Sequence, residues 1–500
     1  MLEPTEDKKT EEKKSEIKDN HLEIKKKLEK IVGENWVSDF QCDLLLYSYD
    51  MTENPPHIPD YVVLPRTPEE ISETIKLGNE YKLPIIPYST GNNVGGIAIP
   101  LEGGIIVDLK RMDKILRVNE DDMYMIVEPG VTWGHIRKFL DENYPEFRYC
   151  YPMAPPYSAV VANALQDGLT NLSTRHGCMT EFLNGIEVVL PNGKIARIGS
   201  CMIGDEFWWG KVPMPDLLGL FLGWQGMTGI VTKAALKVWP KRPIRDLQFA
   251  IFNDLPSTYD FVKKISRTEI LNDLLLISIE TLKLIQGVPI GEAKHLEGEP
   301  RYSAILDFSS NTELEQKAKF ELIKGILSEY KEKDPKIVFS SVESLAKAMG
   351  GVVKDVLNLP MTIGGMLEYG GLTWVGTYFP TKTQSVLEGA KKAFKIIRKH
   401  NFETCLYCRS MESHHYWAFR FLLRFDKGKE GETERMRELS KELFESLFEY
   451  GALPYKTPVW AGKMILEQSD PNTVELMKKI RKTMDPNQIM NPGRWGLDEE

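Results

Sequence analysis

Hydrophobic and polar residues follow two spacings along the chain, one typical of amphipathic helices and one typical of strands. The segment TPEE at 67–70 combines a capping box with a proline at the first helical position, and predicts a helix that ends before Pro84. Thr132 predicts the start of another helix that reaches about Tyr144, and residues 21–33 predict a third. These helices alternate with β-rich runs, which indicates a series of α/β units.

The β-rich runs are short and bounded by turn residues. Residues 85–86 and 103–109 predict two strands, and the runs on either side of Asp121-Asp122 predict a hairpin. Residues 185–198 contain Pro-Asn-Gly between two such runs, and Asn-Gly predicts a type I′ turn because both residues accept positive φ angles. Two prolines within 240–246 interrupt the pattern and indicate a domain boundary.

Composition and charge narrow the function classes. The 500 residues are 42% hydrophobic and 27% charged, as in ordinary globular proteins, and the net charge of −9 argues against a nucleic-acid binder. The longest nearly apolar run, at 217–224, is too short to span a bilayer, and the charged N-terminus predicts no secretory signal. The sequence therefore predicts a protein without a transmembrane segment.

Six cysteines are present, and only Cys405 and Cys408 form a CxxC pair. One such pair is at most half of a zinc or cluster site, so we expect two small buried residues and no metal. The cysteine usage favours a reducing, cytoplasmic compartment.

The loop YSTGNNVGG at 88–96 is the first candidate for chemistry. It follows a predicted strand and is rich in small residues, so its backbone N–H groups could hold an anion such as a phosphate. Its glycines do not form the GxGxxG pattern of dinucleotide-binding folds, and no GK[ST] follows. The loop alone leaves its ligand open.

Five further segments accompany this loop in a fixed order. They are PDYVVLPRTPEEI (59–71), VEPGVTWGHI (127–136), NGIEVVLPNGKI (184–195), GMTGIVTKAALKVWP (226–240) and DPNQIMNPGRWG (485–496). Together with the loop they resemble the FAD-binding domain of the vanillyl-alcohol oxidase and p-cresol methylhydroxylase superfamily, the PCMH type.

The resemblance implies an α+β fold in which a PCMH-type FAD-binding domain of two α/β subdomains carries an inserted α+β substrate (cap) domain. We expect a disordered charged tail at 1–20, the FAD-binding domain at 21–242 with its core at about 55–242, the cap domain at 243–452, and a C-terminal return to the FAD domain at 453–500.

The resemblance also implies the residues that hold the cofactor. The 88–96 loop is expected to wrap the pyrophosphate of FAD, and the segments at 158–165 and 229–232 are expected to line the flavin. The predicted cofactor-binding residues are Ser89, Thr90, Gly91, Asn92, Asn93, Gly95, Gly96, Pro152, Ser158, Ala159, Asn163, His176, Gly229, Ile230, Asn491 and Arg494.

Several residues typical of the phenol-oxidising branch of the superfamily are absent. The flavin-linking histidine that follows a Gly-Gly pair in that branch corresponds to Leu372, so we expect non-covalent FAD. A catalytic aspartate of that branch falls near Ala154. The branch that oxidises 2-hydroxy acids is similar in the N-terminal half, but its histidine motif is missing. The chain is thus expected to be a divergent member.

The candidate catalytic residues lie in the C-terminal half. His414 or His415 is expected to be the base, because histidine titrates near neutral pH and the phenol-oxidising branch has a His-His pair in a nearby segment. Tyr455 and Lys456 stand where that branch has a Tyr-Arg pair that holds a phenolate, and with Arg409 they are predicted to bind an anionic group. A core or surface histidine and an arginine on a solvated strand edge are the alternatives.

These residues predict an FAD-dependent oxidoreductase that removes a hydride from a CH–OH or benzylic carbon of a small, anionic or phenolic substrate. The alternatives are a 2-hydroxy-acid (lactate- or glycolate-type) dehydrogenase and a non-catalytic flavin-binding subunit of an electron-transfer complex. An electron-acceptor protein is a possible partner. Trp208 and Trp209 lie in a segment that resembles an interface loop, which predicts a homo-oligomer.

Overall fold

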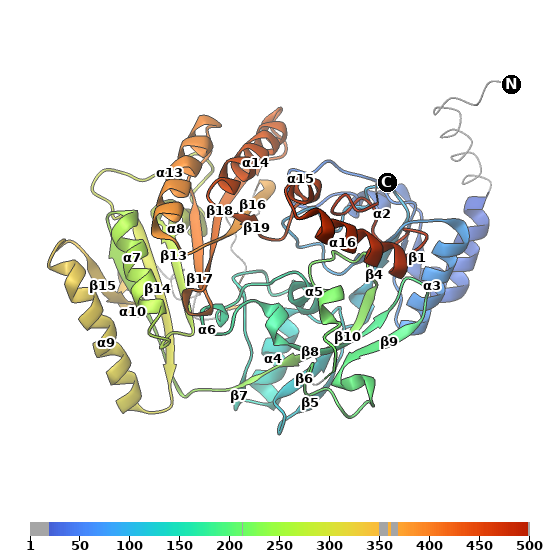
Figure 1. Ribbon diagram of the computed structural model, residues 1–500, viewed down its shortest axis with the longest axis horizontal. Helices are drawn as coiled ribbons and strands as arrows, with labels where there is room; N and C mark the ends of the chain where they lie inside the picture. The colour runs from blue at the N-terminus through green and yellow to red at the C-terminus, as the bar shows by residue number, and fades with distance from the viewer. Residues whose placement is uncertain (1–19, 213, 350–358, 362–368, 499–500) are drawn as a thin grey trace.

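The computed structural model describes residues 20–212, 214–349, 359–361 and 369–498 of the chain. Two halves lie side by side in Figure 1, one built from the N-terminal strands and the other from residues 244–454, and the C-terminal helices return to the first half. Helices packed on sheets confirm the predicted α+β class.

The first sheet is small and mostly parallel, with the strand order β1-β2-β4-β3. Its elements are β1 (Val37–Ser38), α2 (Gln41–Leu46), β2 (Tyr61–Val63), α3 (Pro68–Tyr81), β3 (Ile85–Tyr88) and β4 (Ile105–Asp108). The predicted N-cap of α3 is confirmed, because the Thr67 side chain accepts a hydrogen bond from the Glu70 amide. Strand β3 delivers the glycine-rich loop to the carboxyl end of this sheet, where α/β folds bind ligands.

The helix predicted at 21–33 spans residues 20–32 and packs on the same sheet. Ile24, Leu28 and Val32 are buried, whereas Leu22 is 63% exposed and lies on the solvent side. Three buried residues at a spacing of four give the helix one apolar face.

The second sheet is antiparallel, with the strand order β5-β6-β10-β8-β9. The elements of this region are β5 (Ile115–Asn119), β6 (Tyr124–Val127), α4 (Trp133–Asn143), β7 (Phe147–Arg148), α5 (Val160–Leu165), α6 (Ser173–His176), β8 (Leu183–Val189), β9 (Ile195–Gly199), β10 (Ile230–Lys237) and β11 (Trp239–Pro240). Both predicted hairpins are present, and Thr132 caps α4 as predicted.

The turn between β8 and β9 differs from the prediction. Of the turn residues Pro191, Asn192 and Gly193, only Gly193 has a positive φ, of 79°. Its amide donates to the Leu190 carbonyl, and the Leu190 amide donates to the Lys194 carbonyl. The type I′ prediction is wrong because the loop has three residues, with the glycine in the left-handed position.

The third sheet forms the cap half and is antiparallel, with the order β15-β12-β14-β13-β17-β18-β16-β19. Its strands are β12 (Ile244–Phe252), β13 (Asp273–Ser278), β14 (Tyr302–Ser310), β15 (Val338–Ser341), β16 (Gly370–Phe379), β17 (Leu406–Met411), β18 (Tyr416–Asp426) and β19 (Leu453–Pro454). Its helices are α7 (Leu255–Ser266), α8 (Ile279–Ile285), α9 (Glu313–Lys331), α10 (Val342–Met349), α13 (Thr383–Lys399) and α14 (Glu432–Phe448). Helices α7, α9, α13 and α14 bury one face of the sheet, and the opposite face packs against the first half.

Helices α15 (Ala461–Glu467) and α16 (Pro471–Met484) bring the C-terminus back to β3. The Ile85 amide donates to the Ile489 carbonyl, and the Asn491 amide donates to the Ile85 carbonyl. This pairing places the C-terminal segment beside the strand that carries the glycine-rich loop.

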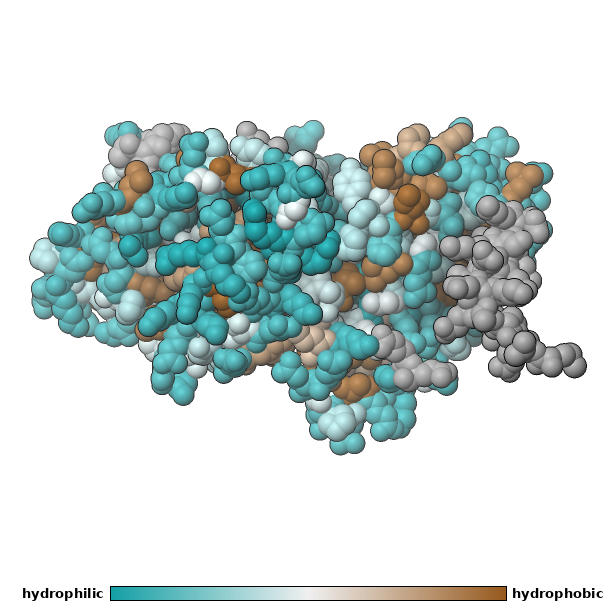
Figure 2. All heavy atoms as spheres, turned by 90° about the horizontal axis from the view of Figure 1, so that it is seen from above, coloured by the Kyte–Doolittle hydropathy of each residue, from teal (hydrophilic) through white to brown (hydrophobic). Residues whose placement is uncertain are grey.

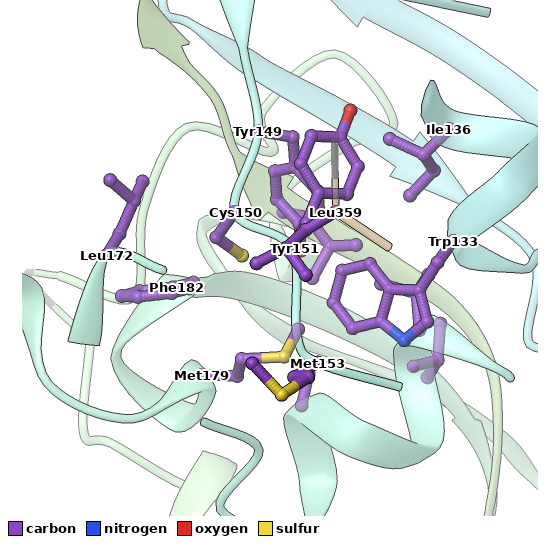
Figure 3. Close-up of a cluster of buried hydrophobic side chains, with 14 of the residues drawn as sticks. Trp133, Ile136, Tyr149, Cys150, Tyr151, Met153, Leu172, Met179, Phe182 and Leu359 are labelled. Carbon is purple, nitrogen blue, oxygen red and sulfur yellow. The ribbon is translucent and has the colours of Figure 1, made fainter. Parts of the chain in front are cut away.

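The core between the two halves is continuous. Figure 3 shows Trp133 and Ile136 of α4 facing Tyr149 and Tyr151, with Leu359 packed among them. Cys405 belongs to this core and Cys408 to the core under the helices, so their side chains lie on opposite faces of the sheet. The prediction of two small buried cysteines is confirmed, and no group of three metal-binding side chains occurs in the described ranges.

Polar side chains dominate the face of the molecule in Figure 2, with apolar groups gathered in places. Exposed apolar side chains include Phe40, Leu45, Leu46 and Tyr49, on and beside α2. Within the part of the chain that the structure describes, no helix has the length and apolar character needed to cross a membrane.

Candidate active site

A cavity lies at the carboxyl end of β3, between the glycine-rich loop, α5 and the segment 225–231. Of the predicted cofactor-binding residues, those that line it are Ser89, Thr90, Gly91, Asn92, Asn93, Ala159, Asn163, Gly229 and Ile230. Segments far apart in the sequence thus converge on one concave surface. We call this surface the cradle.

Side chains hold the loop in an open curve. The Thr90 hydroxyl accepts a hydrogen bond of 3.2 Å from the Ala159 amide. The Asn93 side-chain oxygen accepts from the amides of Gly95 and Ile97, at 3.1 and 3.0 Å. Gly91 has a φ of 68°, a conformation that glycine adopts without strain. These hydrogen bonds hold the loop in shape, and none of them involves a lysine of the kind found in GK[ST] phosphate loops.

Two side-chain amide groups of the loop have no partner within the described part of the chain. The side-chain nitrogens of Asn92 and Asn93 are buried and make no hydrogen bond in the structure. Each such donor costs about 1–3 kcal/mol when left unsatisfied. Phosphate oxygens are strong acceptors and would satisfy both donors, so the cradle fits the diphosphate of a nucleotide cofactor.

Asn491 and Arg494, predicted near the cofactor, lie behind the loop. Arg494 donates to the carbonyl of Gly96 at 3.1 Å, and Asn491 donates to the carbonyl of Gln225 at 2.6 Å. Both side chains are buried. The geometry makes them positioning residues that fix the walls of the cradle from the C-terminal segment. Gly95 is fixed in the same way, because its carbonyl accepts from the Val459 amide.

A second cavity of about 110 Å³ adjoins the cradle. Asn92, Asn163 and Lys456 line both cavities and form the junction between them. The wall of the second cavity is largely apolar, and its apolar and aromatic residues include Met51, Val94, Met153, Leu169, Met361, Leu372 and Trp374. The apolar wall suits a small substrate with an apolar body, and we call this cavity the substrate cavity.

Arg420, which the sequence interpretation missed, lies in the substrate cavity. Its guanidinium stacks on the rings of Trp374, Tyr407 and Tyr455, at 4.9, 4.6 and 5.3 Å from the ring centroids. The side chain is 3% exposed, and its Nε and Nη2 atoms have no hydrogen-bond partner. The sequence feature that could have identified Arg420 is an arginine within the apolar strand segment YWAFRFLLRF, since a buried guanidinium needs a partner.

Arg409 lines the same cavity, as predicted for an anion-binding residue, but it is not on a solvated edge. Its Nη2 lies 3.0 Å from a carboxylate oxygen of Asp273, and its Nε has no partner. Burial raises the pKa of Asp273 to about 6, an effect that Arg409 opposes. Arg409 is therefore partly neutralised, whereas Arg420 forms no ion pair with any residue that the structure describes.

Lys456 occupies the junction of the two cavities. Its Nζ donates a hydrogen bond of 2.7 Å to the Asn163 side-chain oxygen. Burial lowers the pKa of Lys456 to about 8, and the nearby Asp167 opposes that shift. A lysine with such a pKa can exist as a neutral amine near working pH. Tyr455 lies beside it and lines the substrate cavity.

The histidine predictions are corrected by the structure. His414 is buried on the helix-covered side of the cap sheet, with its ring nitrogens 3.0 Å from the Ser410 hydroxyl and 3.2 Å from the Tyr259 hydroxyl. Burial lowers its pKa to about 3. His415 is exposed. Neither histidine is among the described residues that line the two cavities, because both lie in the turn between β17 and β18.

His176 is also displaced from the cofactor position predicted for it. Its ring stacks on Trp239 with centroids 5.2 Å apart, and the described lining of both cavities does not include it. Pro152 and Ser158 line the substrate cavity instead of the cradle. The short helix α6 directs His176 toward β11, which periodicity cannot predict.

The two positions where catalytic groups of the phenol-oxidising branch are expected lie in the substrate cavity. Both Ala154 and Leu372 line it. Neither side chain can transfer a proton or bond to a flavin. Both positions thus lie in one cavity, and neither residue there can accept a proton.

Two sequence families match the chain. The pattern of the FAD binding domain matches residues 59–199, and that of the C-terminal domain of FAD linked oxidases matches residues 245–495, about half of the chain. The chain belongs to the FAD-linked oxidases. This FAD-linked oxidase is an FAD-dependent oxidoreductase that acts on CH–OH or CH groups, and the cofactor prediction is confirmed.

Several relatives extend over most of the chain. The mitochondrial D-lactate dehydrogenase (cytochrome) of Arabidopsis thaliana is 24% identical over 96% of this chain and 81% of its own. The glycolate oxidase subunit GlcD of Bacillus subtilis is 26% identical over 94% and 96%. The flavoprotein subunit of 4-cresol dehydrogenase (hydroxylating) of Pseudomonas putida is 26% identical over 89% of each chain.

Solved structures confirm the predicted PCMH-type fold. Substrate-bound p-cresol methylhydroxylase superimposes with a TM-score of 0.86 at 21% identity, covering 96% of this chain and 97% of that one. The 4-ethylphenol oxidase of Gulosibacter chungangensis gives 0.85 at 18% identity, with the same coverage.

Gly95 provides a test of the cradle. A Cβ atom there would lie 2.8 Å from the Lys456 carbonyl oxygen, a backbone atom that cannot move aside cheaply. We expect Gly95→Ala to weaken FAD binding by about thirtyfold, corresponding to ~2 kcal/mol of overpacking. Flavin fluorescence titration of the apoprotein measures this constant.

Gly325→Ala is the matched control, because Gly325 lies in α9 with no atom within 4 Å of its added Cβ. It should leave FAD affinity unchanged and stabilise the helix by up to about 1 kcal/mol. Equal FAD affinity of Gly95→Ala and the wild type would show that the 88–96 loop does not bind FAD.

Proposed function

We propose that this FAD-linked oxidase oxidises a CH–OH or benzylic carbon of a small substrate that carries an anionic oxygen, either a phenolate or a carboxylate. The supporting observation is Arg420, a buried guanidinium that lines the cavity next to the cradle and whose Nε and Nη2 atoms have no partner among the described residues; Arg409 lines the same cavity beside Asp273. A buried cation without a partner is costly, and an anionic substrate oxygen would offset that cost.

The residues have different roles in the proposed reaction. Bound FAD supplies the hydride acceptor. Arg409 and Arg420 orient the anionic end of the substrate, and the apolar wall excludes water from the reacting carbon. Lys456, at the junction of the cavities, takes up the proton from the substrate hydroxyl in its neutral form.

Oxidation of a 2-hydroxy acid is the second candidate, and Arg409 and Arg420 support it because guanidinium binds carboxylate in two-pronged geometry. The relatives named as D-lactate dehydrogenase and glycolate oxidase subunit point the same way. The apolar wall and the relative named 4-cresol dehydrogenase favour an aromatic body.

Anaerobic mixing with lactate, glycolate, mandelate, vanillyl alcohol and p-cresol, read by loss of flavin absorbance, separates these candidates. We expect reduction by aromatic members of the panel. Reduction by lactate and glycolate alone would make the second candidate correct. Reduction by none of the five would argue against the proposed substrate class.

We expect FAD to be held without a covalent bond. Leu372, at the position of the linking histidine, has a buried aliphatic side chain that cannot form one. Acid precipitation should therefore release the flavin into the supernatant, where its absorbance is measured. Yellow colour that stays with the pellet would contradict the expectation.

We also propose a homo-oligomer formed through the 200–212 segment. Trp208 is buried, but Ile203, Phe207, Trp209 and Val212 are between 44% and 67% exposed, and such apolar groups favour contacts between chains. Sedimentation at micromolar concentration tests this, and a monomer that Trp209→Ser leaves unchanged would contradict it.

We also propose that the protein is cytoplasmic and that a protein accepts its electrons. All six cysteines are unpaired, which supports a reducing compartment. Cell fractionation tests the location, and recovery in an oxidising compartment would contradict it. Turnover with oxygen that is as fast as turnover with an artificial acceptor would contradict the need for an acceptor protein.

A further inference from the structure

A polar hollow separate from the cradle and the substrate cavity lies between the two halves. It has a volume of about 210 Å³ and lies where β7 and β11 of the first half meet β12 and β14 of the cap sheet. Its lining shares no residue with the cradle or the substrate cavity among those described. We call it the hinge hollow, because the chain passes from one half to the other along its edge at 241–244.

Cationic side chains crowd the hinge hollow. Five of them line it, against the two carboxylates of Asp141 and Asp307; the five are Arg137, Arg148, Lys241, Arg242 and Arg245. They come from α4, β7, β12 and the 241–243 connection, so folding alone brings them together. Arg175 adds a further positive charge nearby.

Most of these cations have an acidic partner. Arg245 pairs with Asp307, Arg137 lies 2.6 Å from Asp141, and Arg242 lies 3.1 Å from Glu315. Arg148 differs, because it donates a 3.3 Å hydrogen bond to the Ser309 hydroxyl and forms no ion pair with the described residues, among which its buried Nε has no partner. Arg148 thus lies in the hollow without a carboxylate in direct contact.

The neighbouring positive charges also act on the titratable groups of this region. The pKa of Arg148 is lowered to about 10, mainly by burial and in smaller part by Arg242, Arg175 and Arg245, while Asp307 opposes the shift. The pKa of His176 is lowered to about 4, again mainly by burial, with smaller contributions from Arg175 and Arg148.

The floor of the hollow is apolar. Tyr149, Tyr151, Leu172 and Leu359 line it, and Figure 3 shows them as part of the core cluster. Charges above such a floor interact through a lower effective dielectric than charges in water do. An anion would therefore be held more strongly here than on an open basic surface.

We propose that the hinge hollow binds a small anion with closely spaced oxygens, of the phosphate or tricarboxylate class, with Arg148 and Arg242 as its main contacts. Phosphate and tricarboxylate share the required chemistry, which is several negative oxygens within the reach of planar guanidinium donors. Because the hollow joins the two halves, the bound anion would tie them together.

Isothermal titration of the FAD-saturated protein with inorganic phosphate or citrate, at ionic strength balanced with sodium chloride, tests the proposal. We expect saturable binding of one anion per chain, about tenfold or more weaker in Arg148→Gln, since a charge-assisted hydrogen bond is lost. Comparison of the titration with phosphate and the titration with citrate shows which class of anion the hollow binds.

Arg242→Gln serves as a second variant, because Arg242 lies at the rim and its loss disturbs the core less than that of Arg148. Arg398→Gln, an exposed arginine on α13, is the matched control and should bind as the wild type does. Flavin absorbance verifies that each variant is folded. Absence of saturable binding, or equal affinity in Arg148→Gln and Arg242→Gln and the wild type, would overturn the proposal. So would binding that Arg420→Met abolishes, since the anion would then occupy the substrate cavity.

Discussion

Replacing Arg420 with methionine should lower kcat/KM by about 10³-fold for the substrate that reduces the flavin, while FAD remains bound. Methionine keeps an unbranched stem against Trp374, Tyr407 and Tyr455, so the change removes charge and leaves most of the packing. Removing one partner of a buried charge pair costs about 4 kcal/mol, which corresponds to that factor. Anaerobic stopped-flow reduction of the flavin measures it.

Two comparisons make this test specific to charge. A neutral methyl ether or ester of the substrate should react poorly with the wild type and no worse with Arg420→Met, because the lost contact is with the anionic oxygen. Arg424→Met on the same strand removes a buried arginine that bonds to Glu403 and the Val288 carbonyl. That variant should unfold at a lower temperature, yet its holoenzyme should keep kcat/KM within about twofold. An Arg420→Met enzyme as active as the wild type would exclude Arg420 from substrate binding.

Replacing Lys456 with methionine should slow flavin reduction by about 10²-fold and remove its pH dependence. The pKa of Lys456 is about 8, so the ammonium form dominates below pH 8 and the neutral amine above it. Only the neutral form can accept a proton, and the wild-type rate should therefore rise toward pH 8 and level off above it. Methionine cannot titrate, so the variant should give a flat profile between about pH 7 and 9.

Lys456→Arg separates the proton acceptor from an anion-binding cation. Arginine keeps the positive charge and cannot lose its proton in this range, so the variant should bind substrate with a similar KM and react as slowly as Lys456→Met. A Lys456→Arg enzyme with the wild-type rate would make Lys456 an anion-binding residue. Lys392→Met, on the exposed side of α13, is the control and should change neither the rate nor the profile.

Most residues predicted to hold the cofactor line one cavity, and the sequence could predict this because the segments that carry them have local shapes. The loop at 88–96 carries its own shape through Gly91 and Asn93, and nine of the predicted residues line one cavity. The helix start at Thr67 and the hairpin around Asp121-Asp122 followed from interactions within a few residues. The geometry of the turn at 191–193 could not be predicted from its Asn-Gly pair, because the loop has three residues and its length decided the turn type.

The roles proposed for Arg420 and Lys456 could not be predicted in this way. His414 and Arg420 are six residues apart, and both looked like polar groups near one strand, yet the structure places them on opposite faces of the cap sheet. Register decides this, since Arg420 lies opposite Tyr407 on β17 and opposite Gly376 on β16. A Cβ atom at Gly376 would lie 2.9 Å from Arg420 Cγ, so the glycine makes room for the guanidinium.

The sequence by itself determined the family, the FAD cofactor and most of the cradle, because turn chemistry, caps and ordered motifs are encoded within short segments. Only the tertiary structure decided the substrate cavity, the proposed exchange of a histidine base for Lys456, and the hinge hollow. Each of these arises where strands and loops distant in sequence meet, and the burial that shifts a pKa or leaves a guanidinium without a partner exists only after that packing.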